Sequence, residues 1–500
     1  MSYKTFRSFV TFGITVMLLA SLMGCSANSA NKNNESTEAT PLVDSVSDAS
    51  SQDKKETNLS EEYDASSATL VTLEQSYTIK DEGTYVFSGE LSDGQILVDA
   101  AGKKVQIVLN QVDITCSNCA CIYVKKADQV SVTLAENSIN HLTTTEAFEA
   151  DGEIKVDGVI FSKADLVLNG SGTLQITSNS KNGVVSKDSL EITNGSYYVE
   201  AASHAFEAND ELTISGGHIE VAKSYEGLEA EAIYIKGGEV DITASDDGIN
   251  AAGGDNNLIE ISDGTVKVNA DGDGLDSNGS LLISGGYTLI SGPTNNGNSA
   301  LDFESTCTIT GGTLIATGSS GMVEAISSES TQVSVTLGLS EYVESTFSLC
   351  DSNGKEILSI TPEKKYNCII VSSPELQIGQ SYTLTAGSNV QELEISQVCY
   401  SNIQGMGPGS MGPGGTNRPD KPQNMDGSDL QGGPQDGGSF DGQEPPQDGK
   451  TFGGQEPPQD GKTFGGQEPP QKQGDTDDSN SSQNLSDLDQ QISSQDLTVM

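Results

Sequence analysis

A repeat of 21 to 26 residues runs from Leu166 to Ala316 and constrains the fold of this chain more than any other feature. One repeat cannot bury its own apolar residues, so successive repeats must stack on one another. Three short strands per repeat, stacked in parallel, predict an all-β solenoid with coils ~4.8 Å apart. The apolar column that sets the spacing consists of Leu166, Leu190, Leu212, Ile233, Ile259, Leu281 and Cys307.

A second column with the same spacings holds glycine, as expected for a turn between two strands. Cys307 stands where the apolar column otherwise has Leu or Ile, so we expect a small buried hydrophobic residue there. The glycine column consists of Gly172, Gly195, Gly217, Gly238, Gly264, Gly286 and Gly312.

The ends of the repeat predict the domain organisation. Alternating strands before the regular repeat are interpreted as irregular opening coils, so the β-helix domain is placed at residues 66–322. The spacing breaks near Val323, and strands in another arrangement predict a small C-terminal β cap at 323–402, which would cover an open sheet edge. Residues 26–65 are predicted to be a disordered linker, and the Gly/Pro/Gln-rich residues 403–500 a disordered tail.

Residues 1–25 have the features of a bacterial export signal. Lys4 and Arg7 precede an apolar run that is too short to span a membrane comfortably. The run ends in Leu-Met-Gly-Cys25, which resembles a lipobox and implies lipid attachment to Cys25. The protein is therefore expected outside the cytoplasm, lipid-anchored to the cell membrane and exposed at the cell surface. The alternative is an ordinary signal peptide with an incidental cysteine.

The charge balance excludes some partners. The net charge is −47, with 25 Lys and Arg against 72 Asp and Glu, so no nucleic-acid partner is expected. Arg7 and Arg418 are the only arginines and Trp is absent. The chain therefore lacks bidentate clamps for carboxylates and the strongest aromatic platform for a sugar ring. The tyrosines considered for stacking are Tyr197, Tyr198, Tyr225, Tyr234 and Tyr287.

The cysteines do not have the spacing of a zinc site. Cys116, Cys119 and Cys121 have no second cysteine pair or nearby histidine to complete four ligands. A local disulfide or buried thiols are expected there. Pairing among Cys350, Cys368 and Cys399 is left open.

One column of the repeat is acidic. Two carboxylates on adjacent coils repel each other by roughly 1 kcal/mol in water and roughly 3–4 kcal/mol at an effective dielectric near 20. A cation would remove this opposition to stacking, and dense oxygen ligands with no histidine nearby favour Ca²⁺ over zinc or iron. The alternative is a solvated acidic face. The acidic column is Glu207, Glu229, Asn250, Asp276 and Asp302, and neighbouring positions add Glu226, Asp246, Asp247, Asp271 and Asp273.

Several phrases of the repeat resemble a known family. They include Glu226-Gly-Leu-Glu, Asp246-Asp-Gly-Ile-Asn and Asp273-Gly-Leu-Asp. They resemble bacterial carbohydrate-binding proteins with a calcium-containing, right-handed parallel β-helix of the pectate-lyase type, over roughly residues 68–400. The resemblance implies that fold, bound calcium and binding of acidic polysaccharides such as polygalacturonate. The matching acidic positions are Glu226, Glu229, Asp246, Asp247, Asn250, Asp271, Asp273, Asp276 and Asp302, whereas Val185 breaks the column at its start.

Two classes of function follow from these observations. The first is a monomeric, non-catalytic surface protein in which calcium bridges the acidic face to uronate carboxylates. The second is a calcium-dependent polysaccharide lyase, whose base would have to be a lysine, with Lys223 the best placed. An adhesive or structural role at the cell surface is a further alternative.

Overall fold

The computed structural model describes residues 63–403, which contain 34 strands and no helix. Within these residues there is accordingly no helix with the length and apolar character needed to cross a membrane. The predictions for the export signal, Cys25, the linker and the C-terminal repeats fall on residues 1–62 and 404–500, outside the described part of the chain.

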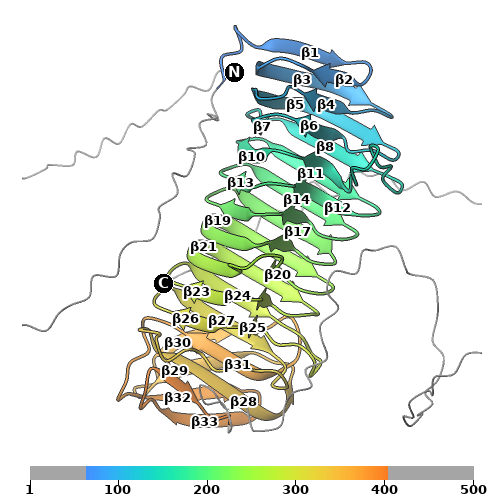
Figure 1. Cartoon of the computed structure of the whole chain (residues 1–500). Coiled ribbons are helices and arrows are strands. Elements are labelled where there is room, and N and C mark those ends of the chain that lie inside the picture. The colour runs from blue at the N-terminus through green and yellow to red at the C-terminus, as the bar shows by residue number, and fades with distance from the viewer. Residues whose placement is uncertain (1–62, 404–500) are drawn as a thin grey trace, which may run out of the picture. The chain divides into compact units, whose positions relative to one another are not determined.

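Parallel strands stack coil upon coil, from β1 in blue to β27 in yellow (Figure 1). Each regular coil contributes one strand to a ten-stranded sheet and two strands, or one long strand, to a second sheet. The ten-stranded sheet consists of β2 (Tyr77–Ile79), β4 (Ile96–Asp99), β6 (Ile122–Lys126), β9 (Gly158–Ser162), β12 (Asn182–Ser186), β15 (Phe206–Ala208), β18 (Leu228–Ala230), β20 (Ile249–Ala251), β22 (Leu275–Ser277) and β25 (Leu301–Phe303).

The larger sheet wraps the other sides of each coil. Its solenoid strands are β1 (Thr69–Leu73), β3 (Gly83–Leu91), β5 (Lys104–Cys116), β7 (Gln129–Leu134), β8 (Ile139–Thr144), β10 (Asp165–Gly170), β11 (Thr173–Ser178), β13 (Leu190–Ile192), β14 (Ser196–Ala201), β16 (Glu211–Ile214), β17 (His218–Ser224), β19 (Ala232–Ala244), β21 (Leu258–Ala270), β23 (Ser280–Ile283), β24 (Tyr287–Ser291), β26 (Thr306–Ile309) and β27 (Thr313–Gly318).

The strand register confirms the parallel β-helix. Leu166 pairs with Leu190, and the pairing continues through every position of the apolar column to Cys307. All seven side chains are at most 1% exposed and belong to one continuous core inside the coils. Identical apolar positions therefore stack directly on one another, which is how short repeats bury their apolar side.

The glycine column works as predicted except at its first position. Gly217, for example, has a φ of +90°, and a Cβ there would lie 2.8 Å from the carbonyl oxygen of Gly195 in the preceding coil. In the first regular coil Gly170, and not Gly172, has the positive φ. The left-handed conformation brings the turns of adjacent coils into close contact, which a side chain would prevent.

The pairing direction changes after β27. This strand pairs antiparallel with β31 (Tyr366–Ser372), which also pairs antiparallel with β28 (Ser334–Val343). These strands and the four-stranded sheet cover the last coil around a separate apolar cluster, in orange in Figure 1. The remaining strands are β29 (Phe347–Asp351), β30 (Glu356–Ile360), β32 (Ser381–Ala386), β33 (Asn389–Glu394) and β34 (Cys399–Ser401).

The expected local disulfide and a buried thiol are both present at Cys116, Cys119 and Cys121. Cys116 and Cys119 form a disulfide, which closes the turn after β5. Cys121 lies beside them as a buried thiol. Cys350, Cys368 and Cys399 are free, so the pairing left open among them does not occur.

Candidate functional site

The acidic column lies on one line across the ten-stranded sheet. Its members are the middle residues of β15, β18, β20, β22 and β25. Each pairs with the next: Glu207 with Glu229, Glu229 with Asn250, Asn250 with Asp276 and Asp276 with Asp302. At the other end Glu207 pairs with Val185, so the column becomes apolar there, as the sequence indicated.

A second polar column runs alongside, three residues earlier in each coil. We call it the turn column, and its backbone is tied from coil to coil. The amide of Gly183 donates to the carbonyl of His204 at 2.9 Å, and the amide of Gly248 donates to that of Asp273 at 2.9 Å. The turn column therefore stacks as regularly as the strand beside it. Its members are Asn182, His204, Glu226, Asp247, Asp273 and Ser299.

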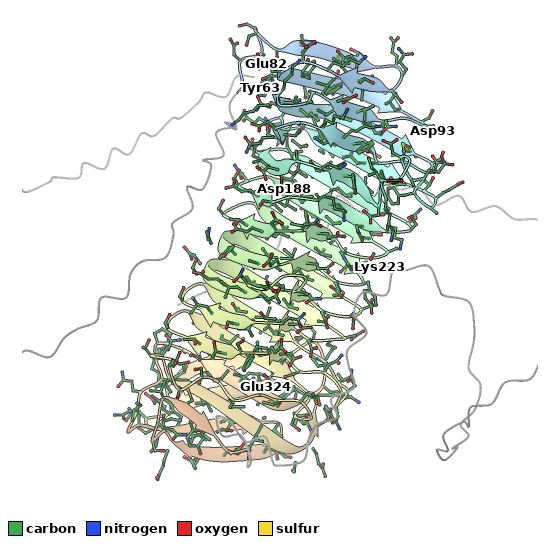
Figure 2. All side chains as sticks on the ribbon, viewed as in Figure 1. Tyr63, Glu82, Asp93, Asp188, Lys223 and Glu324 are labelled. Atoms are coloured by element: carbon green, nitrogen blue, oxygen red, sulfur yellow. A yellow bond between two sulfur atoms is a disulfide. The ribbon has the colours of Figure 1, made fainter. Side chains whose placement is uncertain are left out.

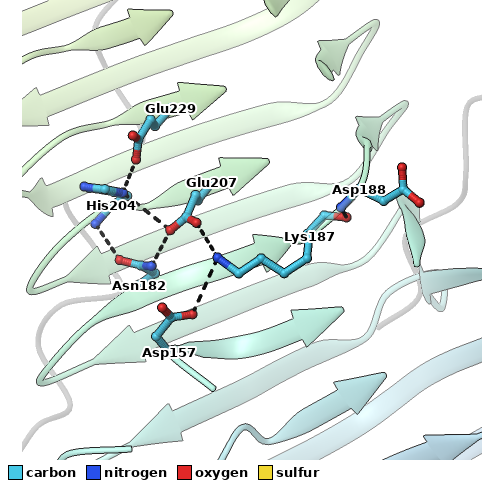
Figure 3. A network of polar contacts seen from close by, with 8 residues as sticks. Asp157, Asn182, Lys187, Asp188, His204, Glu207 and Glu229 are labelled. Atoms are coloured by element: carbon cyan, nitrogen blue, oxygen red, sulfur yellow. Dashed lines mark hydrogen bonds and ion pairs between the residues drawn. The ribbon is translucent and has the colours of Figure 1, made fainter. Parts of the chain in front are cut away.

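Glu207 is neutralised by residues of the protein (Figure 3). Its Oε1 lies 2.6 Å from Lys187 Nζ, and its Oε2 accepts a hydrogen bond of 2.5 Å from Asn182 Nδ2. Burial favours the neutral carboxyl, but His204 and Lys187 outweigh it and lower the pKa of Glu207 to about 2. Glu207 was predicted as a metal ligand, yet its charge is already offset here.

His204 lies between two carboxylates of the acidic column. Its Nδ1 contacts Glu229 Oε2 and lies 3.6 Å from Glu207 Oε2. Burial opposes the charged imidazolium, but the two carboxylates outweigh it and raise the pKa of His204 to about 10. The premise that no histidine lies near the acidic column was therefore wrong. His204 stands only three residues before Glu207 in the sequence, whereas its contact with Glu229 joins residues of adjacent coils.

Two further groups of possible ligands overlap at Glu226. Its carboxylate lies within 4.8 Å of His204 and Glu229 on one side and of Asp246 and Asp247 on the other. Asn250 Nδ2 donates to Glu226 Oε2 at 3.0 Å. Burial raises the pKa of the Glu226 carboxyl, because few solvent dipoles reach it. These positions can offer carboxylate oxygens to one cation from adjacent coils.

The third group is the most deeply buried. Asp247, Asp273 and Asp276 converge within 4.8 Å and are 3%, 6% and 2% exposed. Asp247 Oδ1 accepts a 2.7 Å hydrogen bond from the amide of Asp273, whose own Oδ1 accepts one of 2.5 Å from Ser299 N. These backbone bonds fix the carboxylates in place. Three buried carboxylates this close together are costly unless positive charge compensates them.

A glycine leaves space beside this group. A Cβ on Gly272 would lie 2.5 Å from Asp247 Oδ1 and 2.6 Å from Asp246 Oδ1. Any side chain there would displace these carboxylates. The donors are hard carboxylate oxygens, so the residues fit a calcium ion better than a metal that prefers nitrogen or sulfur.

Some predicted site residues lie elsewhere. Asp271 is 71% exposed in its side chain and pairs at 3.2 Å with Lys364, and Asp302 continues the acidic column without joining any of the three groups. Lys223, the candidate base, is exposed at the turn side of the solenoid (Figure 2).

Tyr225 precedes β18 and is 48% exposed, and Asp246 raises its pKa to about 12 through a hydrogen bond. The other four tyrosines lie on strands of the larger sheet, away from the acidic column.

Sequence reasoning missed the polar members of the turn column that are not acidic, Asn182, His204 and Ser299. A signal was present, because each stands three residues before a member of the acidic column or before Val185. The same offset holds for Glu226, Asp247 and Asp273, which were selected for their charge alone.

The residues of both polar columns lie in the part of the chain that matches a known protein family. The family described as carbohydrate-binding domain-containing protein matches residues 73–254 and 230–344, more than half of the chain and all of both polar columns. The chain belongs to this family. A carbohydrate-binding domain-containing protein of Acetivibrio thermocellus is 38% identical over 136 residues, which are 26% of this chain and 47% of the relative. The chain thus spans about half the length of this curated relative.

One solved structure is also similar to this member of the carbohydrate-binding family. It is described as the polysaccharide lyase-like protein from C. thermocellum, in a gadolinium derivative. The sequence identity is 27%, the match covers 49% of this chain and 96% of that chain, and the TM-score is 0.38.

Proposed function

We propose that this chain is a non-catalytic carbohydrate-binding protein of the cell surface that holds acidic, pectin-like polysaccharide through calcium on its acidic face. Membership of the carbohydrate-binding family supports a polysaccharide partner. The binding of calcium, the acidic character of the sugar and the lipid anchor at Cys25 are proposed in addition to this partner.

The convergence of Asp247, Asp273 and Asp276 carries the proposal. Each of these carboxylates is at least nine-tenths buried, and they come from two adjacent levels of the coil stack. Removing charge from water costs several kcal/mol per ion, and proteins recover that cost by pairing or metal coordination. A divalent cation of the size of Ca²⁺ would be held by these oxygens, with Asp246 and Asn250 available on the same coil as Asp247 and Glu226 on the coil before it.

A bound cation would also supply the grip on the sugar. Both arginines, Arg7 and Arg418, lie outside the described residues 63–403, so no guanidinium flanks the acidic face there. Calcium accepts six to eight oxygen ligands, so ligands beyond those of the protein can come from a uronate carboxylate. Tyr225 is the one stacking candidate of the five beside this face, next to Glu226 and half exposed.

The test is retention of the full chain on immobilised polygalacturonate with calcium and with a chelator. We expect retention with calcium, loss with chelator, and loss in Asp276→Asn even with calcium. Asp255→Asn is the matched control, because Asp255 is exposed in the loop after β20. If the protein is retained equally well in chelator and in the Asp276→Asn variant, calcium-mediated binding is excluded.

The same samples distinguish binding from cleavage. Ultraviolet absorbance of unsaturated sugar product would appear if the chain were a lyase, and its loss in Lys223→Ala would identify the base. Retention without product supports the binding role.

For the anchor, Cys25→Ser should move the protein from the membrane fraction to the medium, whereas unchanged fractionation would argue against lipidation.

A further inference from the structure

The two ends of the solenoid are closed differently. At the C-terminal end, β27 pairs with β31 of the cap. At the opposite end, β1, drawn in blue in Figure 1, pairs with β3 alone among the described residues. One edge of β1 therefore presents unpaired backbone N–H and C=O groups, which can accept another strand.

β1 also lacks the charged residues that protect other edge strands. Its sequence is Thr-Leu-Val-Thr-Leu, whereas β30 at one edge of the cap sheet carries Glu356, and β33 at the other edge carries Glu392 and Glu394. Native proteins place charge on exposed edges to prevent pairing with another chain. Five uncharged residues at the edge of a chain with a net charge of −47 are thus open to strand addition.

The outer face of β1 continues an apolar column. Leu70 pairs with Val86, which pairs with Val108, and the three side chains are 70%, 8% and 0% exposed. Tyr63 and Ala68 pack against the cluster that contains Val86 and Val108. A strand added beyond β1 would place a side chain opposite Leu70 and cover it in turn.

Both ends of the described chain lie away from this edge. Tyr63 lies beside Leu134 and Gly170, on β7 and β10, which are three and four strands from β1. At ~4.8 Å per strand, this is about 14–19 Å from the edge. Ile403 lies beside Gly338 in the cap, at the far end of the solenoid. Neither neighbouring segment is directed at the edge of β1, so a second molecule is the simplest occupant.

The charge distribution favours a second copy of this chain. Residues 69–126, in the first coils, contain seven acidic residues and five lysines, a net charge of −2. Residues 206–303, which carry the acidic column, contain 18 acidic residues and three lysines, a net charge of −15. Glu207 on β15 lies five strands from the edge strand β2, about 24 Å, which exceeds the screening length of ~8 Å at physiological salt. Two copies can therefore meet at this end without bringing their acidic columns together.

Two identical strands that pair antiparallel about a two-fold axis place one residue opposite its own copy. Leu70 is the most exposed large apolar side chain of residues 63–403, and placing it on the axis covers it in both copies. We propose that β1 pairs antiparallel with β1 of a second copy, with Leu70 against the partner's Leu70, in a head-to-head dimer. This dimer, in place of the monomer expected from the sequence, goes beyond the proposed function and does not depend on it. Each arm of the dimer carries one acidic face.

The test is sedimentation of the full chain carrying Cys25→Ser in excess chelator, so that neither acyl chains nor calcium contribute to association. We expect a change from monomer to dimer between about 1 and 200 µM, as for a weak interface. Leu70→Lys should raise the dissociation constant at least about tenfold, because it adds charge to the edge and removes apolar area. Ile139→Lys is the matched control and should associate as wild type. Ile139 is 52% exposed on the same sheet, but its strand β8 pairs on both sides.

Leu70→Cys supplies a second measurement that does not depend on affinity. With a mild oxidant, it should form a disulfide between two copies of the peptide that carries position 70, identified by mass spectrometry, whereas Ile139→Cys should not. The proposal is overturned if the chain is monomeric throughout, if Leu70→Lys associates like wild type, or if Leu70→Cys gives no such cross-link. A monomer that associates only after deletion of residues 26–62 would assign the edge to the chain's own preceding segment, which also overturns the proposal.

Discussion

The Nδ1 of His204 contacts the carboxylate of Glu229, which belongs to the next coil of the solenoid. Through this contact and a second one to Glu207, a single imidazolium lies between two stacked carboxylates and offsets part of their charge. The acidic column therefore changes character along its length. Its first two levels are compensated by His204 and Lys187, whereas at the later levels the buried carboxylates of Asp247, Asp273 and Asp276 converge within 4.8 Å of one another.

Replacing His204 should expose the cost of the stacked carboxylates. His204→Gln leaves Glu207 and Glu229 with one cation fewer in a largely buried position, and we expect a loss of about 2–3 kcal/mol in the free energy of unfolding, measured in urea. His218→Gln is the control, because its pair with Glu239 has side chains 36% and 48% exposed. That change should cost less than about 1 kcal/mol. Equal losses in the two variants would contradict the role given to His204.

The pH dependence of stability should show two separate losses. The pKa of Glu207 is about 2 in the fold against 4.5 for a free carboxyl, so its contribution is complete above 4.5 and is lost as the pH falls towards 2. The pKa of His204 is about 10 against 6.5, so its contribution is complete below 6.5 and is lost as the pH rises towards 10. We expect thermal unfolding in chelator to show a maximum between these limits.

The variants Glu207→Gln and His204→Gln should each flatten one side of this profile. Glu207→Gln should remove part of the acid loss, and His204→Gln part of the alkaline loss. A wild-type profile with the same slopes as the variants would show that these two groups do not govern the titration.

Calcium should stabilise the wild-type chain and leave Asp276→Asn unaffected. A ligand at a hundred times its dissociation constant stabilises a fold by about 2.7 kcal/mol. We therefore expect a calcium-dependent rise in melting temperature for wild type and for Asp255→Asn. Asp276→Asn should be at least as stable as wild type in chelator, because one of three adjacent carboxylates is neutral. An equal response of all three proteins to calcium would place the ion elsewhere.

The thiols should differ in reactivity according to burial. Burial raises the pKa of Cys121, Cys307 and Cys368 to about 12, so little thiolate forms at neutral pH. Cys350 is half-buried. Alkylation of the native protein followed by peptide mass spectrometry should modify Cys350 well before these three. Rapid labelling of Cys307 would mean that the core column opens far more readily than its packing indicates.

Much of this architecture could be predicted because a solenoid is locally encoded. The pairing of Leu166 with Leu190 follows from a spacing that is visible in the chain, since each coil contacts its immediate neighbours. The same logic placed Glu207, Glu229, Asn250, Asp276 and Asp302 on one line. The site was less predictable, because charge alone was used to choose its members. His204 escaped notice although it occupies the same position as Glu226 in the coil.

The sequence by itself determined the parallel β-helix, the stacking of its apolar and glycine columns and the alignment of its carboxylates. These depend on repeat spacing, which fixes the register of neighbouring coils. Only the tertiary structure decided which carboxylates are compensated, because this depends on where the ends of Lys187 and His204 reach between coils. It also decided that Asp271 pairs with Lys364. Such contacts join side chains from different coils, and repeat spacing carries no information about side-chain direction beyond the strand.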